Sequence, residues 1–196
     1  MKRQRLSASF KILMTALPLV AVFSLISPAL ASDHADRCEA EGKAFKALSV
    51  TEPAKAPPAF PITTADGDEL GLADFKGRGV IVNFWATWCA PCVREMPELD
   101  NLKAELADDG IDVIAISMDR GGHKVVAPFF ERYGIKNLPS LVTPSKSGST
   151  LGIRGLPTTL LIDAEGREVA RIVGLMKYDT PDAVAYFKRC LAPGGS

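Results

Sequence analysis

The chain has 196 residues, 47% of them hydrophobic, which is enough for one domain with a sizeable core and additional segments. The first 31 residues hold four of the 23 basic residues and no acidic residue, so the remainder, with 19 basic and 23 acidic residues, has a net charge of about −4. A mildly acidic domain without a basic cluster argues against nucleic acid as a partner.

The first predicted element is an export segment over residues 1–31. Four basic residues precede an apolar stretch that runs from Ile12 to Leu30. Ala29-Leu30-Ala31 fits the small-x-small pattern of signal cleavage, with cleavage after Ala31. Residues 12–31 are also just long enough to cross a bilayer as an uncleaved anchor, so both outcomes stay open. Either one places the domain outside the cytoplasm, in a bacterium on the periplasmic side, where structural disulfides survive.

Residues 32–63 form an N-terminal extension with a different composition. Residues 36–48 predict a short helix, which Gly42 weakens. Residues 52–61 are rich in proline and predict an extended strap without a core of its own, either docked or solvated. We expect the main domain to occupy residues 64–196.

The domain is organised around a strand, a short loop and a helix. Residues 80–85 form an apolar run rich in β-branched and aromatic side chains, which predicts a buried central strand. A helical spacing of apolar residues follows, and it predicts a helix. Its members are Cys92, Met96, Leu99, Leu102 and Leu106. The sequence Cys89-Ala90-Pro91-Cys92 lies between the two elements.

The position of this cysteine pair favours a reactive thiolate. Free N–H groups at a helix start and the helix dipole stabilise negative charge on Cys89. Cysteines in such places have a pKa lowered from about 8.5 to roughly 3.5–7. We therefore interpret Cys89 as the nucleophile and Cys92 as the resolving thiol. Pro91 suits a helix start because its fixed φ matches the first turn.

Three other uses of a cysteine pair compete with redox chemistry. A structural zinc site needs four ligands, and the remaining cysteines, Cys38 and Cys190, lie far away in the sequence. Haem attachment requires histidine after the second cysteine, where this chain has Val93. An inert structural disulfide is a further alternative, although a strand-to-helix tip is a poor place to bury one. Redox catalysis is the favoured interpretation.

The rest of the chain alternates between strand and helix patterns. Strands are predicted over residues 111–117, 138–142, 158–162 and 168–173, with a hairpin turn at 163–166. Helices are predicted over residues 123–133 and 181–191. This order predicts an α/β sandwich with a mixed sheet.

Two segments of the chain resemble the thioredoxin superfamily. Residues 82–92 look like its active-site strand, loop and helix, and residues 93–99 are similar to the membrane-associated, TlpA-like branch. Residues 152–163 resemble the family's cis-proline segment. The resemblance covers roughly residues 64–191 and implies a three-layer α/β/α sandwich. Residues 123–142 look like the central helix-strand insertion of the TlpA-like branch.

The resemblance also implies a substrate-binding rim. It implies a cis bond between Leu156 and Pro157 that faces the cysteine pair and exposes the Leu156 backbone to a client strand. Trp88, Ala90 and Pro91 would complete the rim. No organic cofactor or metal is implied.

Asn83 departs from thioredoxin, which has a buried aspartate at the matching position. Because asparagine cannot accept a proton from the second cysteine, another base is needed. Glu95, one turn into the helix, is a candidate for proton transfer. A solvated acid that complements the helix dipole is the favoured interpretation of Glu95.

The function expected from these residues is thiol:disulfide exchange. The TlpA-like resemblance implies reduction of client disulfides during assembly of cytochromes c or of the copper centres of cytochrome oxidase. Clients would be apocytochromes or copper chaperones, and electrons would come from a membrane donor of the DsbD or CcdA type. Alternatives are a disulfide-forming oxidant, a Cu(I) carrier using the thiolate pair, and a thiol peroxidase.

Cys38 and Cys190 lie outside the redox motif of a chain expected to be exported. Such a pair invites a structural disulfide that would fasten the extension to the closing helix. Two free thiols or an intermolecular bridge are the alternatives. The resemblance supports Cys38 better than Cys190, because the family's partner position is occupied here by Arg167.

Overall fold

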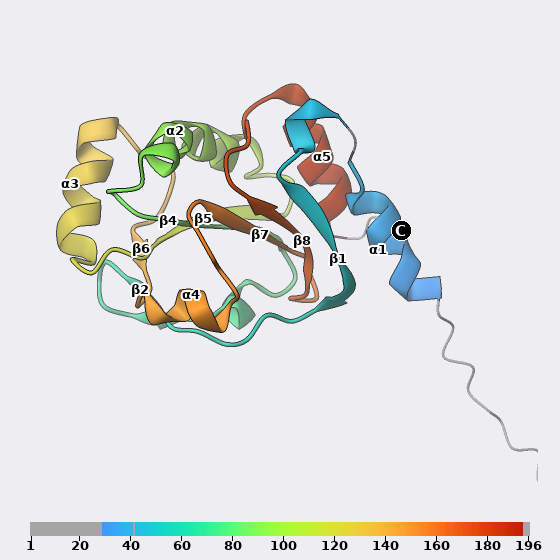
Figure 1. Cartoon of the computed structure of the whole chain (residues 1–196), viewed down its shortest axis with the longest axis horizontal. Helices are drawn as coiled ribbons and strands as arrows, with labels where there is room; N and C mark the ends of the chain where they lie inside the picture. Colours follow the sequence, from blue (N-terminus) through green and yellow to red (C-terminus); the bar gives the residue numbers. More distant parts are fainter. Residues whose placement is uncertain (1–28, 41, 194–196) are drawn as a thin grey trace, which may run out of the picture.

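The computed structural model describes residues 29–40 and 42–193 (Figure 1). Its strands form one mixed sheet in the order β1-β8-β7-β4-β5-β6-β2-β3. The strands are β1 (Leu48–Lys55), β2 (Ile62–Thr64), β3 (Glu69–Leu70), β4 (Gly79–Trp85), β5 (Ile111–Ser117), β6 (Leu141–Val142), β7 (Thr158–Ile162) and β8 (Glu168–Val173). The helices are α1 (Ala29–Cys38), α2 (Ala90–Glu105), α3 (His123–Tyr133), α4 (Lys146–Thr150) and α5 (Pro181–Leu191), with 3₁₀ turns η1 (Lys43–Phe45) and η2 (Leu72–Phe75).

Helices cover both faces of this sheet, so the thioredoxin-like three-layer sandwich is confirmed. Helices α2, α3 and α5 lie on one side in Figure 1, and α4 lies on the other. Strand β4 is buried along its whole length, parallel to β5 and antiparallel to β7. Its alternation sends Ile81 and Trp85 into one core and Val82 and Phe84 into the other. A strand buried on both faces needs the continuous apolar run that the sequence shows.

Helix α2 begins at the tip of this central strand. Its N-cap residue is Cys89, and Pro91 lies in the first turn, where a missing N–H leaves no helical bond unmade. Met96, Leu99 and Leu102 are fully buried against the sheet, as their spacing predicts. The apolar face of α2 therefore packs against the core, and the first turn of α2 lies at the end of the sheet.

The N-terminal extension differs from its predicted structure. The short helix over residues 36–48 is wrong, because α1 ends at Cys38 and β1 begins at Leu48. The strap expected over residues 52–61 starts inside β1, which pairs antiparallel with β8 as an outer strand of the sheet. The extension gains from this pairing the hydrogen bonds that it cannot make alone. His34, within α1, is only 4% exposed.

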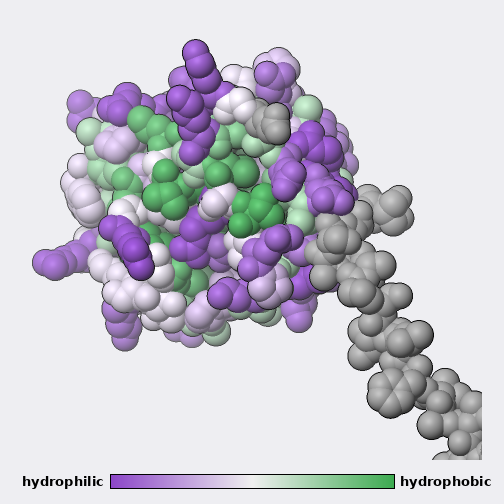
Figure 2. All heavy atoms as spheres, turned by 45° about the vertical axis from the view of Figure 1, so that its right-hand side comes forward, coloured by the Kyte–Doolittle hydropathy of each residue, from purple (hydrophilic) through white to green (hydrophobic). Residues whose placement is uncertain are grey.

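The export segment lies largely outside the described residues, which start at residue 29. Within the part of the chain that is described, no helix is both long and apolar enough to cross a membrane. The face turned to the viewer in Figure 2 carries apolar side chains near its middle, surrounded by hydrophilic ones. Such a surface is ordinary for a protein in contact with water.

Candidate active site

The two cysteines of the redox motif are joined in a disulfide at the start of α2. The Cys89–Cys92 bond has an S–S distance of 2.06 Å, and the Cys92 backbone N–H lies 3.3 Å from the Cys89 sulfur. Cys89 is 5% exposed and Cys92 is fully buried. The helix start thus offers its N–H groups to the first sulfur while the second sulfur faces the core.

The neighbouring side chains form an exposed tip around the disulfide. Trp88 is 71% exposed and is among the most exposed large apolar side chains of the described chain. Ala90 is exposed and Pro91 is half-buried. An apolar surface beside a reactive pair can be covered by a polypeptide partner.

The cis-proline segment reaches the same end of the sheet. The Leu156–Pro157 peptide bond is cis, and Leu156 is half-buried. Thr158 follows directly and pairs with Phe84 near the end of β4, so Pro157 lies beyond that pair on the side where the redox loop emerges. The Pro157 carbonyl accepts a 3.0 Å hydrogen bond from Gly174 N–H, which ties the segment to the loop after β8.

A buried carboxylate holds the loop that precedes Cys89. Asp119, two residues after the end of β5, accepts hydrogen bonds from the Thr87 N–H at 2.8 Å and from the Thr87 hydroxyl at 2.9 Å. The Ser117 hydroxyl donates to the same carboxylate at 2.8 Å. These bonds fasten the turn between β4 and α2 to the neighbouring strand. No local sequence pattern predicts this role for Asp119.

Glu95 is buried, so the favoured interpretation of a solvated acid is wrong. Its side chain is 1% exposed, and its Oε1 accepts a 2.8 Å hydrogen bond from the Asn83 amide. Burial raises the Glu95 pKa from 4.5 to about 8; the Asn83 bond opposes this rise and the nearby Glu98 charge adds to it. Glu95 follows Cys92 by three residues, a spacing that places two side chains on neighbouring positions of one helix face.

A chain of hydrogen bonds continues from Asn83 away from Glu95. The Asn83 amide nitrogen also donates to the Thr159 hydroxyl at 3.0 Å, and that hydroxyl lies 2.7 Å from the Tyr178 hydroxyl. All four side chains are at most 1% exposed. Thr159 faces Asn83 directly in the β4–β7 pairing. Predicting this contact needed the strand register, which the amino-acid pattern alone does not fix.

A hollow of about 460 Å³ opens beside Glu95. Its walls come from η1, from α2 and from the segment between β8 and α5. Glu95 is thus close to solvent on the side of α2 that faces the N-terminal extension.

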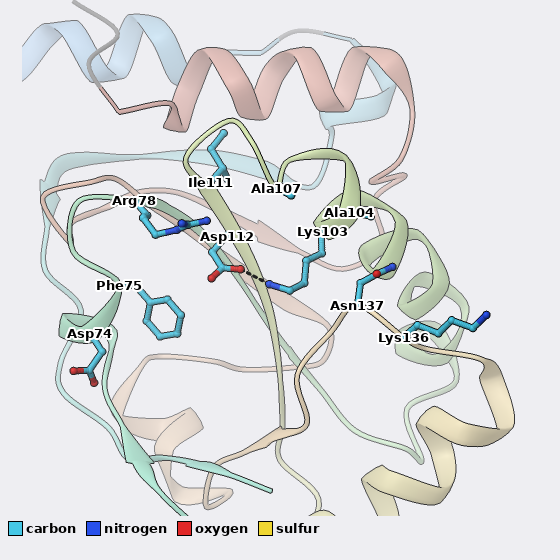
Figure 3. A pocket seen from close by; sticks show the side chains of 10 residues that line it. All are labelled: Asp74, Phe75, Arg78, Lys103, Ala104, Ala107, Ile111, Asp112, Lys136 and Asn137. Carbon is cyan, nitrogen blue, oxygen red and sulfur yellow. Dashed lines mark hydrogen bonds and ion pairs between the residues drawn. The ribbon is translucent and has the colours of Figure 1, made fainter. Parts of the chain in front are cut away.

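A second hollow, of about 670 Å³, lies at the opposite end of the central strands (Figure 3). Arg78 and Ile111 line it where β4 and β5 begin, whereas Cys89 follows the end of β4. Lys103 and Asp112 form an ion pair within it, and the Lys136 side chain points away. Its lining contains no cysteine and none of the predicted site residues.

The structure also joins Cys38 and Cys190 in a disulfide, with Cα atoms 4.6 Å apart. The Tyr186 hydroxyl donates to the Cys38 carbonyl at 2.9 Å, and the Arg189 guanidinium donates to the Arg37 and Glu39 carbonyls at 3.0 Å each. Side chains of α5 therefore satisfy carbonyl groups at the end of α1, which an isolated helix would leave unpaired.

Comparison with known proteins places the chain among redox proteins. Residues 40–186 match the Redoxin family. The thiol-disulfide oxidoreductase ResA of Bacillus thuringiensis is 38% identical over 120 residues, which are 61% of this chain and 69% of that protein. This match includes more than two thirds of the relative's length.

Solved structures agree with the fold. The exposed lipoprotein thioredoxin of Streptococcus pneumoniae is 31% identical, with a TM-score of 0.58 over 68% of this chain and all of that chain. A structure described as a putative DsbE thiol:disulfide interchange protein from Chlorobium tepidum reaches a TM-score of 0.62 at 24% identity, covering 74% of this chain and all of the other. The chain therefore belongs to the Redoxin family of the thioredoxin superfamily and is a TlpA-like thiol-disulfide oxidoreductase.

Proposed function

We propose that this enzyme reduces disulfides of client proteins, with Cys89 as the attacking thiolate and Cys92 as the resolving thiol. The observation that carries the proposal is the Cys89–Cys92 disulfide at the start of α2, at the sheet end where the cis Leu156–Pro157 bond also lies. Cys89 is more exposed than Cys92 and lies at the helix start. Both features favour a thiolate that a client can reach.

The exchange proceeds in two displacement steps. The Cys89 thiolate attacks one sulfur of the client disulfide, a mixed disulfide forms, and the first client thiolate leaves. Cys92 then loses its proton, attacks the Cys89 sulfur and releases the second client thiolate. The client gains two electrons and the enzyme ends as the Cys89–Cys92 disulfide.

Glu95 acts as the base in the second step. Its carboxylate accepts the Cys92 proton. Asn83 cannot take this role, because its amide is not basic enough to accept a proton. A pKa of about 8 matches the thiol it serves, and this similarity favours proton transfer near neutral pH. The burial of both side chains and their three-residue spacing on α2 support the assignment.

The client binds across the exposed tip in an extended conformation. Leu156 offers backbone groups to a client strand, and Trp88, Ala90 and Pro91 line the opposite side of the disulfide. The exposure of Trp88 supports this arrangement, because a partner polypeptide would cover an apolar side chain that water now surrounds.

The enzyme works outside the cytoplasm, on the periplasmic side in a bacterium, either free or tethered by residues 1–31. Its TlpA-like character implies clients in the assembly of cytochromes c or of cytochrome oxidase copper centres, with a membrane electron donor of the DsbD or CcdA type. The basic and apolar start of the chain supports export. The similarity to an exposed lipoprotein thioredoxin points in the same direction.

Clients can be captured with Cys92→Ala. The mixed disulfide on Cys89 then has no resolving thiol, so clients should accumulate as adducts that reductant releases. Cys89→Ser/Cys92→Ala is the matched control and should capture none. Equal capture by both variants would contradict the assignment of Cys89.

The direction of electron flow is tested by the reduction potential of the Cys89–Cys92 pair. A value near about −270 mV is that of a reductant, whereas a value near about −120 mV would make the enzyme a disulfide-forming oxidant. A copper titration of the reduced protein distinguishes a Cu(I) carrier from an oxidoreductase. A carrier would bind the ion through its two soft thiolates, and the Cys89→Ser variant of that carrier would not.

A further inference from the structure

Two hydrogen bonds behind Glu95 start from the same amide nitrogen of Asn83. An asparagine amide nitrogen has two hydrogens, and here one is donated to the Glu95 Oε1 at 2.8 Å and the other to the Thr159 hydroxyl at 3.0 Å. Thr159 therefore acts as an acceptor toward Asn83. Because the amide nitrogen makes both of these bonds, the amide donates to Glu95 and its oxygen points away from that carboxylate.

The opposite amide orientation would be unfavourable for an ionised Glu95. It would place the Asn83 oxygen against a carboxylate oxygen, with no hydrogen between two acceptors. A Thr159 hydroxyl that donates its proton to the Tyr178 oxygen can only accept from Asn83, so it favours the same orientation as the ionised carboxylate. The choice matters because a donor to the carboxylate stabilises its charged, proton-accepting form.

Tyr178 completes the arrangement from the far side. Its hydroxyl lies 2.7 Å from the Thr159 hydroxyl, and its ring is fully buried. Its own backbone N–H donates to Glu98 at 3.1 Å, so the segment that carries Tyr178 is fastened to α2 one turn after Glu95. The phenol is thereby held within hydrogen-bond distance of the Thr159 hydroxyl.

We propose that Thr159 and Tyr178 are positioning residues for proton transfer: they orient the Asn83 amide so that it donates to Glu95 and keeps this carboxylate able to accept the Cys92 proton. This inference rests on the proposed function of Glu95. Neither residue touches the reacting sulfur atoms in the contacts described; both act through Asn83. Other charged groups near Glu95 are Arg94 and Glu98 on α2, and Lys43, Lys177 and Asp182 around the adjoining hollow.

The experiment follows the resolving step in the reduced protein with a chromogenic aryl disulfide. Attack by Cys89 releases one aryl thiolate, and the attack of Cys92 on the mixed disulfide releases the second, so the two steps appear as two phases. The rate of the second phase should rise with pH as Glu95 loses its proton. Glu95→Gln should remove the part of this rise that Glu95 causes and leave only the rise at higher pH where Cys92 itself ionises, which establishes that the wild-type midpoint reports Glu95.

Thr159→Val and Tyr178→Phe remove one hydroxyl each and keep most of the side-chain shape. Loss of the oriented donor raises the pKa of Glu95, so the midpoint of the second-phase profile should move upward by about one pH unit in Thr159→Val and by roughly half a unit in Tyr178→Phe. Thr159→Ser keeps the hydroxyl and should retain the wild-type midpoint. The infrared absorption of the protonated carboxyl should shift its titration by the same amounts.

Two further variants control for the loss of a buried hydrogen bond. Tyr186→Phe removes the bond to the Cys38 carbonyl, and Thr143→Val removes a 2.7 Å bond to the Pro61 carbonyl. Both should lower stability and leave the midpoint unchanged. Wild-type midpoints in Thr159→Val and Tyr178→Phe, with the Glu95-dependent rise lost in Glu95→Gln, would overturn the positioning roles alone. A wild-type profile in Glu95→Gln would overturn the proton-transfer role of Glu95, and the inference with it.

Discussion

The two disulfides among the described residues lie in opposite electrostatic surroundings. Cys89 and Cys92 lie at the N-terminal end of α2, where the helix dipole favours a thiolate. Cys38 is the last residue of α1 and Cys190 the second-last of α5, so both lie at C-terminal ends, where the dipole disfavours negative charge. Because exchange requires a thiolate to form or leave, we expect helix polarity to make Cys89–Cys92 the reactive disulfide and Cys38–Cys190 the structural one.

The span of each bond reinforces this difference. Cys89 and Cys92 are 3 residues apart, whereas Cys38 and Cys190 are 152 residues apart. A bond across a short loop removes little conformational freedom from the unfolded chain, while a long loop removes more. The first pair can therefore open and close during turnover without large consequences for the fold. The second pair contributes to stability only while it stays closed.

The comparison is tested most directly by breaking each pair in turn. Cys89→Ser should reduce the rate of client disulfide reduction to the uncatalysed background, because the attacking thiolate is gone. Cys38→Ser/Cys190→Ser should retain most of the wild-type rate at a temperature where it remains folded. An insulin-type disulfide reduction assay measures both. A fully active Cys89→Ser protein would contradict the division of roles.

The second largest effect concerns stability. Replacing both Cys38 and Cys190 by serine should lower the free energy of unfolding by up to about 5 kcal/mol, from the loop-closure entropy of a span of this size. Urea unfolding with the redox pair kept oxidised provides the measurement. Cys89→Ser/Cys92→Ser serves as the control and should lose much less. Equal losses for the two double variants would show that span does not distinguish the pairs.

The two cysteine pairs should also differ, by a smaller factor, in how readily they are reduced and alkylated. In a graded dithiol buffer, the Cys89–Cys92 bond should open before the Cys38–Cys190 bond. In the protein with only the redox pair reduced, a thiol alkylating agent at about pH 6–7 should label Cys89 at least about tenfold faster than Cys92. Peptide mapping by mass spectrometry reports both orders. Faster labelling of Cys92 would reverse the assigned roles.

The most gradual effect is the pH dependence that Glu95 adds to stability. Because burial raises the Glu95 pKa from 4.5 to about 8, the folded state binds more protons than the unfolded state between these values. The free energy of unfolding should therefore fall as pH rises through that window, by at most about 1.4 kcal/mol per pH unit from this group. Glu95→Gln should remove that part of the slope. Unfolding of the oxidised proteins at several pH values checks it, and identical slopes would contradict the burial argument.

Much of the fold could be predicted because its signals are local. The apolar run of β4, the apolar spacing of α2 and the turn between β7 and β8 each lie within one short segment. The extension resisted prediction because β1 is defined by its partner β8, some 120 residues later, and Gly42 and Pro53 weaken any local pattern. The outcome there depends on tertiary contacts that override propensity.

The candidate site divides in the same way. The Cys89–Cys92 pair and the cis proline were predicted because each lies in a short motif. The burial of Glu95 was not, since a carboxylate in the first turns of a helix is ordinarily solvated and its partner Asn83 comes from another element. Thr159 and Tyr178 required both the β4–β7 register and the path of the segment after β8.

The Asp119 clamp fixes the backbone of the redox loop, but it does not isolate that loop from the insertion. Its carboxylate holds the redox loop to the end of β5, and the chain enters the insertion with α3 and β6 only after that residue. The α3 side chains Phe129 and Phe130 pack against Trp85, the last residue of β4, in the same core that contains Cys92. Because a close-packed core transmits changes in volume, a substitution on the buried face of α3 should reach the redox loop from below, whereas one on its exposed face should not.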